Sequence, residues 1–121
     1  MFGKSFGYCR AGNKEPAFMI LSEVALGKMN AIREPTYMER PPDGFDSTKG
    51  VGRRGPDFAL SLVLPNGVQV PTGPTIDTPV PADQTRNNYY QLQHNEYIVY
   101  NESQSKIRYI IQVGNKNDQE A

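Results

Sequence analysis

The sequence has little of what disulfides and most zinc sites require. Among its 121 residues there is one cysteine, Cys9, one histidine, His94, and no tryptophan. A single cysteine excludes an internal disulfide, and one cysteine with one histidine cannot complete a Cys/His zinc site. We therefore expect no metal site and a reducing, intracellular compartment.

An excess of charge and a long apolar run are also lacking. Thirteen basic and thirteen acidic residues give a net charge of zero, so no overall field attracts nucleic acid or an anionic membrane. No stretch approaches the roughly 18 apolar residues of a membrane span, and residues 1–5 lack the apolar core of a secretory signal. We expect no membrane partner and no DNA-binding segment in this chain.

What the sequence does have is many chain breakers between short apolar segments. Eleven glycines and ten prolines favour short strands and loops over a helical bundle, and the length allows one compact domain. The segments rich in apolar or β-branched residues are predicted as strands: 17–26, 58–64, 68–70, 96–100 and 106–113. The nearly continuous run 17–26 predicts a strand buried on both faces, with a buried helix as the competing interpretation.

The segments between these strands are predicted as turns and loops. Pro65-Asn66-Gly67 provides the positive φ angles of a hairpin turn. Residues 28–56 and 71–88 are predicted as long loops, and short helical turns are expected around 4–8 and 36–40. Residues 114–121 are expected to be a disordered tail. The fold class is therefore α+β, mainly antiparallel β, with long loops.

Residues 50–55 (GVGRRG) match the G-x-G-x-x-G pattern of dinucleotide-binding Rossmann folds. That pattern requires a strand before it and a helix after it, so that helix amides meet the pyrophosphate. Here Pro41, Pro42 and Gly44 precede the pattern, and Pro56 follows it at once. We therefore reject the Rossmann interpretation in favour of a flexible basic loop.

Four stretches together carry a resemblance to a known family. They are residues 4–9 (KSFGYC), 21–27 (LSEVALG), 47–52 (STKGVG) and 95–100 (NEYIVY). In this order and spacing they resemble the C-terminal part of the catalytic domain of poly(ADP-ribose) polymerases, across residues 1–113. Residues 41–47 and 101–109 look most like the number-three branch, known chiefly for adding single ADP-ribose units. The implied fold is a partial, split and mostly antiparallel β structure that holds NAD in a cleft.

The resemblance implies specific roles in a reaction that uses NAD as a substrate. Ser5 would hydrogen-bond the nicotinamide amide, Tyr8 would stack on the pyridine ring, Lys4 would line the same wall, and Glu96 would be catalytic. The residue types suit this chemistry. A fixed carboxylate can stabilise the positive charge that develops on the ribose and can accept the proton of the nucleophile.

Taken alone, each of these residues has a plainer interpretation. Glu96 at the head of an amphipathic strand would more often face solvent. Ser5 could be a helix N-cap, and Tyr8 could be ordinary packing. Cys9 is better explained as a small buried hydrophobe than as a nucleophile. Only the joint occurrence of the four stretches favours the functional interpretation.

The resemblance is incomplete at the active site, because the family uses a His-Tyr-Glu triad. Strands matching the triad histidine and tyrosine are missing, and His94 lies where the family shapes its acceptor site. In an alternative register, residues 1–4 resemble the lead into the triad tyrosine, and Gly7 takes that position. Without partner strands, the run 17–26 would expose unpaired edges and make the isolated chain prone to aggregate.

The function implied is transfer of ADP-ribose from NAD to an acceptor protein or nucleic-acid end, incomplete as this chain. The alternatives are an inactive fragment with a partial nicotinamide pocket and a β-rich interaction module without a nucleotide site. By resemblance alone, the location would be nuclear.

Overall fold

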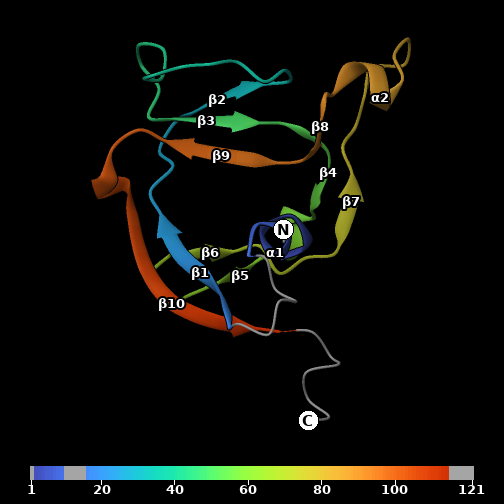
Figure 1. The fold of residues 1–121 in the computed structure, drawn as a ribbon. Helices are drawn as coiled ribbons and strands as arrows, with labels where there is room; N and C mark the ends of the chain where they lie inside the picture. The colour runs from blue at the N-terminus through green and yellow to red at the C-terminus, as the bar shows by residue number, and fades with distance from the viewer. Residues whose placement is uncertain (1, 10–15, 115–121) are drawn as a thin grey trace. The chain divides into compact units, whose positions relative to one another are not determined.

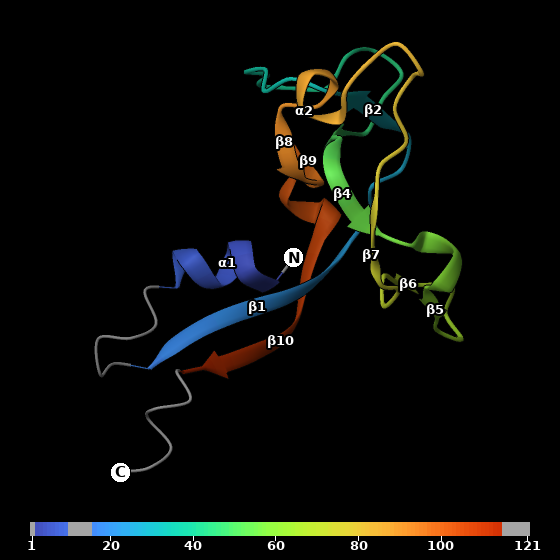
Figure 2. The same ribbon diagram turned by 90° about the vertical axis from the view of Figure 1, so that its right-hand side faces the viewer.

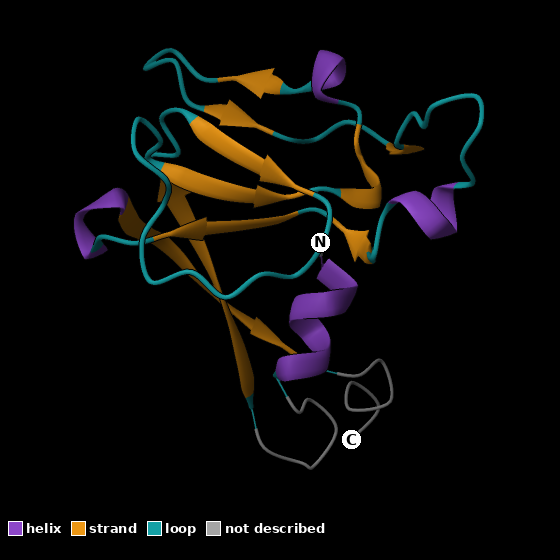
Figure 3. Ribbon diagram, turned by 90° about the horizontal axis from the view of Figure 1, so that it is seen from above, coloured by secondary structure: helices purple, strands orange, loops and turns teal. Residues whose placement is uncertain are grey.

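The structure is a computed structural model that describes residues 2–9 and 16–114. Within these residues the chain forms many short strands and only short helices (Figure 3). It divides into a terminal unit, Met1–Val24 with Ser105–Ala121, and a central unit, Ala25–Gln104. No helix in the described part is long and apolar enough to cross a membrane.

The terminal unit is a two-stranded antiparallel ribbon with one helix (Figure 2). Its elements are α1 (Phe2–Tyr8), β1 (Ala17–Val24) and β10 (Ser105–Val113). The Cys9 thiol, just after α1, donates to the Phe18 carbonyl oxygen at 3.3 Å and so ties the helix to β1. Both strands and the helical turn around residues 4–8 were predicted, and the structure confirms them.

A β-bulge changes the ribbon's register between Leu21 and Ser22. Leu21 pairs with Tyr109 and Ser22 with Ile107, so Arg108 is the extra residue on β10. The Arg108 guanidinium donates to the Glu23 carboxylate, with Nε 2.8 Å from Oε2. The bulge therefore directs Arg108 onto a charged partner on the opposite strand.

The prediction that residues 17–26 are buried on both faces is wrong. Ile20 and Ile110 pair on one face of the ribbon and are 60% and 68% exposed. Leu21 and Tyr109 pair on the other face and are also more than half exposed. An apolar run predicts burial only when other elements cover it, and the described residues leave both faces of this ribbon largely open.

We expect the 121-residue chain to self-associate through this ribbon, because large exposed apolar patches drive association. Replacing Ile20 and Ile110 together by threonine should lower the apparent mass in sedimentation velocity. The matched control replaces Leu62 and Val63, exposed apolar residues of the central unit, and should have a smaller effect. A parent chain that sediments as a monomer would contradict this expectation.

The central unit contains two three-stranded sheets and a short hairpin (Figure 1). The first sheet has the order β2-β3-β9 and consists of β2 (Met29–Ile32), β3 (Ser47–Gly50) and β9 (Glu96–Val99). The second has the order β7-β4-β8 and consists of β4 (Gly52–Pro56), β7 (Thr75–Asp77) and β8 (Leu92–His94). The short helix α2 (Arg86–Tyr89) precedes β8. The pairs β2–β3 and β4–β8 are parallel, and the others are antiparallel.

The prediction of long loops without packed elements is wrong for both segments. Residues 28–56 contain β2, β3 and β4, and residues 71–88 contain β7 and the start of α2. Ser47 and Thr48 are 0% and 1% exposed, more deeply buried than any apolar side chain in the described part. Their hydroxyls are satisfied, because Ser47 Oγ donates to the Leu26 carbonyl oxygen at 2.6 Å and Thr48 Oγ1 lies 2.8 Å from the Tyr100 hydroxyl. Small polar residues therefore form much of the interior of this unit.

The predicted hairpin is confirmed between β5 (Leu62–Val63) and β6 (Gln69–Val70), which are antiparallel. Gly67 in its turn has a φ of 84°, a value that favours glycine. The first part of the expected strand is instead a 3₁₀ helix, Phe58–Leu60, because the Asp57 carboxylate accepts from the Ala59 amide and caps it.

Three further predictions concern ends and turns. The helical turn expected around residues 36–40 is wrong, because these residues contain no helix. The turn expected after β9 is a 3₁₀ helix, Glu102–Gln104. Apart from Gly114, the predicted tail lies outside the described residues.

Candidate active site

Glu96 is the first residue of β9 and lies opposite Gly50 on β3. Its side chain is half-buried. A methyl group at position 50 would lie 2.5 Å from Leu92 Cδ1 and 3.7 Å from Glu96 Cβ. The glycine therefore leaves room for the Leu92 side chain on the face of β3 that the Glu96 Cβ also approaches.

The glycines of residues 50–55 all lie against the segment that leads into Glu96. A side chain on Gly52 would meet the backbone at His94 and lie 2.6 Å from Asn95 N, and one on Gly55 would meet the Asn95 side-chain amide. The pattern spans β3 and β4, and no helix opens from it. This agrees with rejecting the Rossmann interpretation, but the expected flexible loop is wrong. The glycines serve the close approach of two backbone segments.

The two arginines of this pattern have defined partners. Arg53 Nε donates to the carbonyl oxygen of buried Tyr90 at 3.0 Å. Arg54 forms an exposed ion pair with Asp77, with 3.0 Å between Nε and Oδ1, which contributes little stability. Arg53 therefore holds β4 to the end of α2 through backbone contacts.

Lys4, Ser5 and Tyr8 all lie on α1 and are exposed. Tyr8 follows Lys4 by four residues and Ser5 by three, so the helix places the three side chains on one flank. The Tyr8 ring is 82% exposed, which rules out packing in a core. Ser5 lies inside the helix, so the N-cap interpretation is wrong. Cys9 is half-buried and donates to two carbonyl oxygens, those of Ser5 and Phe18.

The helix brings three predicted site residues together, whereas Glu96 belongs to the central unit. Sequence reasoning did not single out Asn95, although it lies in one of the four stretches. Its Oδ1 accepts from the Gly52 amide at 2.9 Å, a partner 43 residues away in the chain. Local pattern gives no signal for such a bond.

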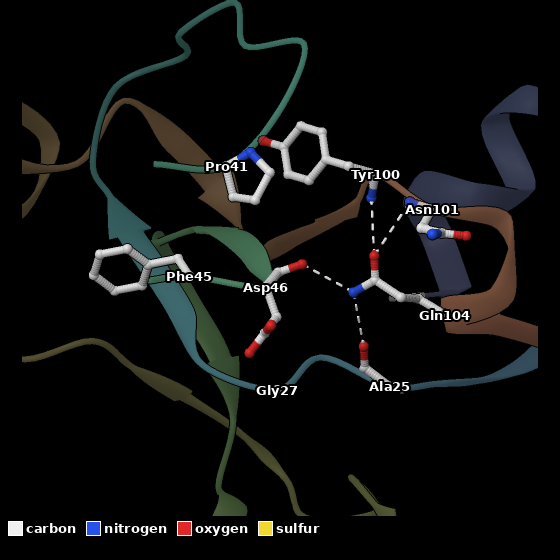
Figure 4. A pocket seen from close by; sticks show the side chains of 8 residues that line it. All are labelled: Ala25, Gly27, Pro41, Phe45, Asp46, Tyr100, Asn101 and Gln104. Atoms are coloured by element: carbon white, nitrogen blue, oxygen red, sulfur yellow. Dashed lines mark hydrogen bonds between the residues drawn. The ribbon is translucent and has the colours of Figure 1, made fainter. Parts of the chain in front are cut away.

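An open pocket of about 500 Å³ lies elsewhere in the central unit (Figure 4). Its lining includes Phe45, Asp46, Tyr100 and Gln104, but not Glu96. The Gln104 amide nitrogen donates to the carbonyl oxygens of Ala25 at 3.1 Å and Asp46 at 2.9 Å. Its oxygen accepts from the backbone amides of Tyr100 at 3.4 Å and Asn101 at 3.1 Å. Gln104 therefore joins three chain segments, and the pocket is distinct from the surroundings of Glu96.

The family comparison agrees with this mostly β arrangement. Residues 1–115 match the family model for the poly(ADP-ribose) polymerase catalytic domain. The chain therefore belongs to this family of ADP-ribosyltransferases.

Its relatives include poly(ADP-ribose) polymerases of plants and animals. Poly [ADP-ribose] polymerase 1 of Oryza sativa subsp. japonica is 41% identical over 114 residues, which are 93% of this chain and 11% of the relative. Poly [ADP-ribose] polymerase 2 of Homo sapiens is 41% identical over 115 residues, 93% of this chain and 19% of the relative. Poly [ADP-ribose] polymerase 2 of Arabidopsis thaliana is 42% identical over 115 residues, which are 93% of this chain and 17% of the relative. The chain spans less than a fifth of each of these relatives.

Gly52→Ala should destabilise the central unit by roughly 1–3 kcal/mol or more, because the new methyl group would meet backbone that cannot rotate away. The free energy of unfolding from urea denaturation measures the effect. Gly7→Ala is the matched control, because beyond its chain neighbours and its own helix backbone nothing lies within 4 Å of the added carbon, and alanine favours a helix. Equal stability of Gly52→Ala and the parent would contradict the close approach.

Stability should also depend on pH through Tyr97. Burial raises the pKa of the Tyr97 phenol above its ordinary value, and a hydrogen bond with the Asn95 side chain opposes this shift. A raised pKa means that the folded state holds the proton more tightly than the unfolded state. The contribution to the free energy of unfolding is therefore complete below about pH 10 and is lost as the pH rises through the folded value.

Tyr97→Phe should reduce this alkaline loss, measured as the unfolding free energy in urea between neutral pH and pH 11. Tyr37→Phe, at an exposed ring, is the control and should keep the slope of the parent. A slope that Tyr97→Phe leaves unchanged would show that another group causes it.

Proposed function

We propose that this chain takes part in the transfer of ADP-ribose from NAD to an acceptor, with Glu96 as the catalytic carboxylate. The observation that supports this most is the position of Glu96: half-buried, at the start of β9, opposite Gly50 and beside Leu92. Membership of the poly(ADP-ribose) polymerase catalytic-domain family supports the reaction class.

In the proposed reaction, nicotinamide leaves with the electron pair of the bond between its nitrogen and ribose C1′. The developing positive charge on the ribose is stabilised by the Glu96 carboxylate. An acceptor hydroxyl then forms the new bond to C1′ and loses its proton to the same carboxylate. The acceptor class remains protein or nucleic-acid end, as the resemblance implies.

For the terminal unit, we propose that α1 provides contacts for the nicotinamide. Ser5 would hydrogen-bond its amide, Tyr8 would stack on its ring, and Lys4 would line the same wall. Their common, exposed flank on α1 supports this assignment. Stacking on a positively charged pyridine ring contributes on the order of 0.5 to 2 kcal/mol.

Two finer properties are proposed from sequence resemblance alone. Residues 41–47 and 101–109 look most like the number-three branch, known chiefly for adding single ADP-ribose units, so we propose that this chain is most similar to that branch. The relatives compared above carry polymerase names, which apply to those proteins. A nuclear location is proposed on the same resemblance.

The test is a chimera in which residues 1–115 of this chain replace the matched region of the human relative. With labelled NAD, the chimera should label an acceptor, and Glu96→Gln should lower the rate by about 10²-fold or more. Glu102→Gln, at an exposed glutamate near the end of β9, is the matched control and should keep the rate. Gel analysis of the labelled product distinguishes single units from polymers.

Three outcomes would count against the proposed function. The first is a folded chimera that transfers nothing, and the second is a rate that Glu96→Gln leaves unchanged. The third is a nicotinamide analogue that raises the melting temperature while no transfer occurs, which would favour a binding module.

A further inference from the structure

The chain changes its direction at Asn95, immediately before Glu96. β8 runs parallel to β4, with Leu92 beside Gly52 and His94 beside Arg54. β9 then runs antiparallel to β3, with Glu96 beside Gly50. Asn95 is the single residue between the two strands. The backbone conformation at this one position therefore determines where β9 begins and the direction in which the Glu96 side chain projects.

The Asn95 side chain fixes this turn at two points. Its Oδ1 accepts from the Gly52 amide, the first residue of β4, at 2.9 Å. Its amide group lies directly against Gly55, where a methyl group would be 3.3 Å from Asn95 Cγ. A short amide held at both points has little freedom, and neither has the backbone that carries it.

The Asn95 side chain and Glu96 meet different strands. Asn95 contacts β4, at Gly52 and Gly55, whereas Glu96 lies opposite Gly50 on β3. We therefore expect an effect of Asn95 on the carboxylate to pass through the backbone.

We propose that Asn95 is a positioning residue, which aims the Glu96 carboxylate by clamping the turn before it to Gly52 and Gly55. This inference rests on the proposed function of Glu96 as the catalytic carboxylate. The Asn95 side chain packs against Gly52 and Gly55, and a side chain at either position would displace it. Misplacing a reacting group by about 1 Å can cost about 10²-fold in rate.

The experiment compares Asn95→Leu and Asn95→Asp in the chimera described above. Leucine has a similar size but no acceptor, whereas aspartate keeps an oxygen for the Gly52 amide. Asn95→Leu should lower kcat by about 10²-fold, with little change in KM for NAD, because only the carboxylate is displaced. Asn95→Asp should recover most of that loss.

Asn66→Leu is the matched control. Asn66 Oδ1 also accepts a backbone hydrogen bond, from Val68 at 3.2 Å, but it does so within the β5–β6 turn. It should leave kcat unchanged, because that turn has no assigned part in the reaction.

A double-mutant cycle separates positioning from a general loss of structure. In the Glu96→Gln background, Asn95→Leu should cause little further loss, because the group that it positions is already absent. Loss of the fold would instead lower the residual rate again. Amide hydrogen exchange adds a readout without NAD: Asn95→Leu should expose the Gly52 amide to exchange, and Asn95→Asp should keep it protected.

The failures of the two proposals are distinguishable. If Glu96→Gln keeps the parent rate, the proposed function is wrong. If Glu96→Gln loses the rate but Asn95→Leu keeps it, only the positioning inference is wrong. Equal losses from Asn95→Leu in both backgrounds would also overturn the inference.

Discussion

The close approach of two backbone segments, residues 50–55 and 92–96, is the constraint on which the central unit depends. Glycine at positions 50, 52 and 55 allows it, because any side chain there would meet Leu92, the His94–Asn95 backbone or the Asn95 amide. Both three-stranded sheets include one strand from each segment. The same approach sets the start of β9, so the fold and the placement of Glu96 share one physical cause.

Much of the strand content could be read from the sequence, because β1, β9, β10 and the hairpin turn have strong local patterns. The strands within residues 28–56 could not, because their buried positions are occupied by glycine, serine and threonine, which give no apolar periodicity. Burial of β1 could not be predicted either. An apolar run shows what a strand can bury, whereas its exposure depends on what packs against it.

The candidate site also has features that local sequence predicts and one that it does not. Helical spacing predicts that Lys4, Ser5 and Tyr8 share a flank, and the strand pattern predicts that Glu96 opens β9. Neither pattern reveals Asn95, since its importance comes from Gly52, a partner far away in the chain. Side-chain bonds between distant segments are a property of the folded topology, and local sequence carries little trace of them.

The connectivity of the ribbon has a consequence for the order of folding. β1 and β10 are neighbours in space, but the whole of Ala25–Gln104 lies between them in sequence. Closing so long a loop costs conformational entropy before any strand pairing offsets it. The Ala25 amide donates to the Gln104 carbonyl oxygen at 2.7 Å, at the two ends of the central unit. Once that unit has formed, Val24 and Ser105 are already neighbours. Pairing of β1 with β10 can then start at these two residues and extend along the strands, as in a local hairpin.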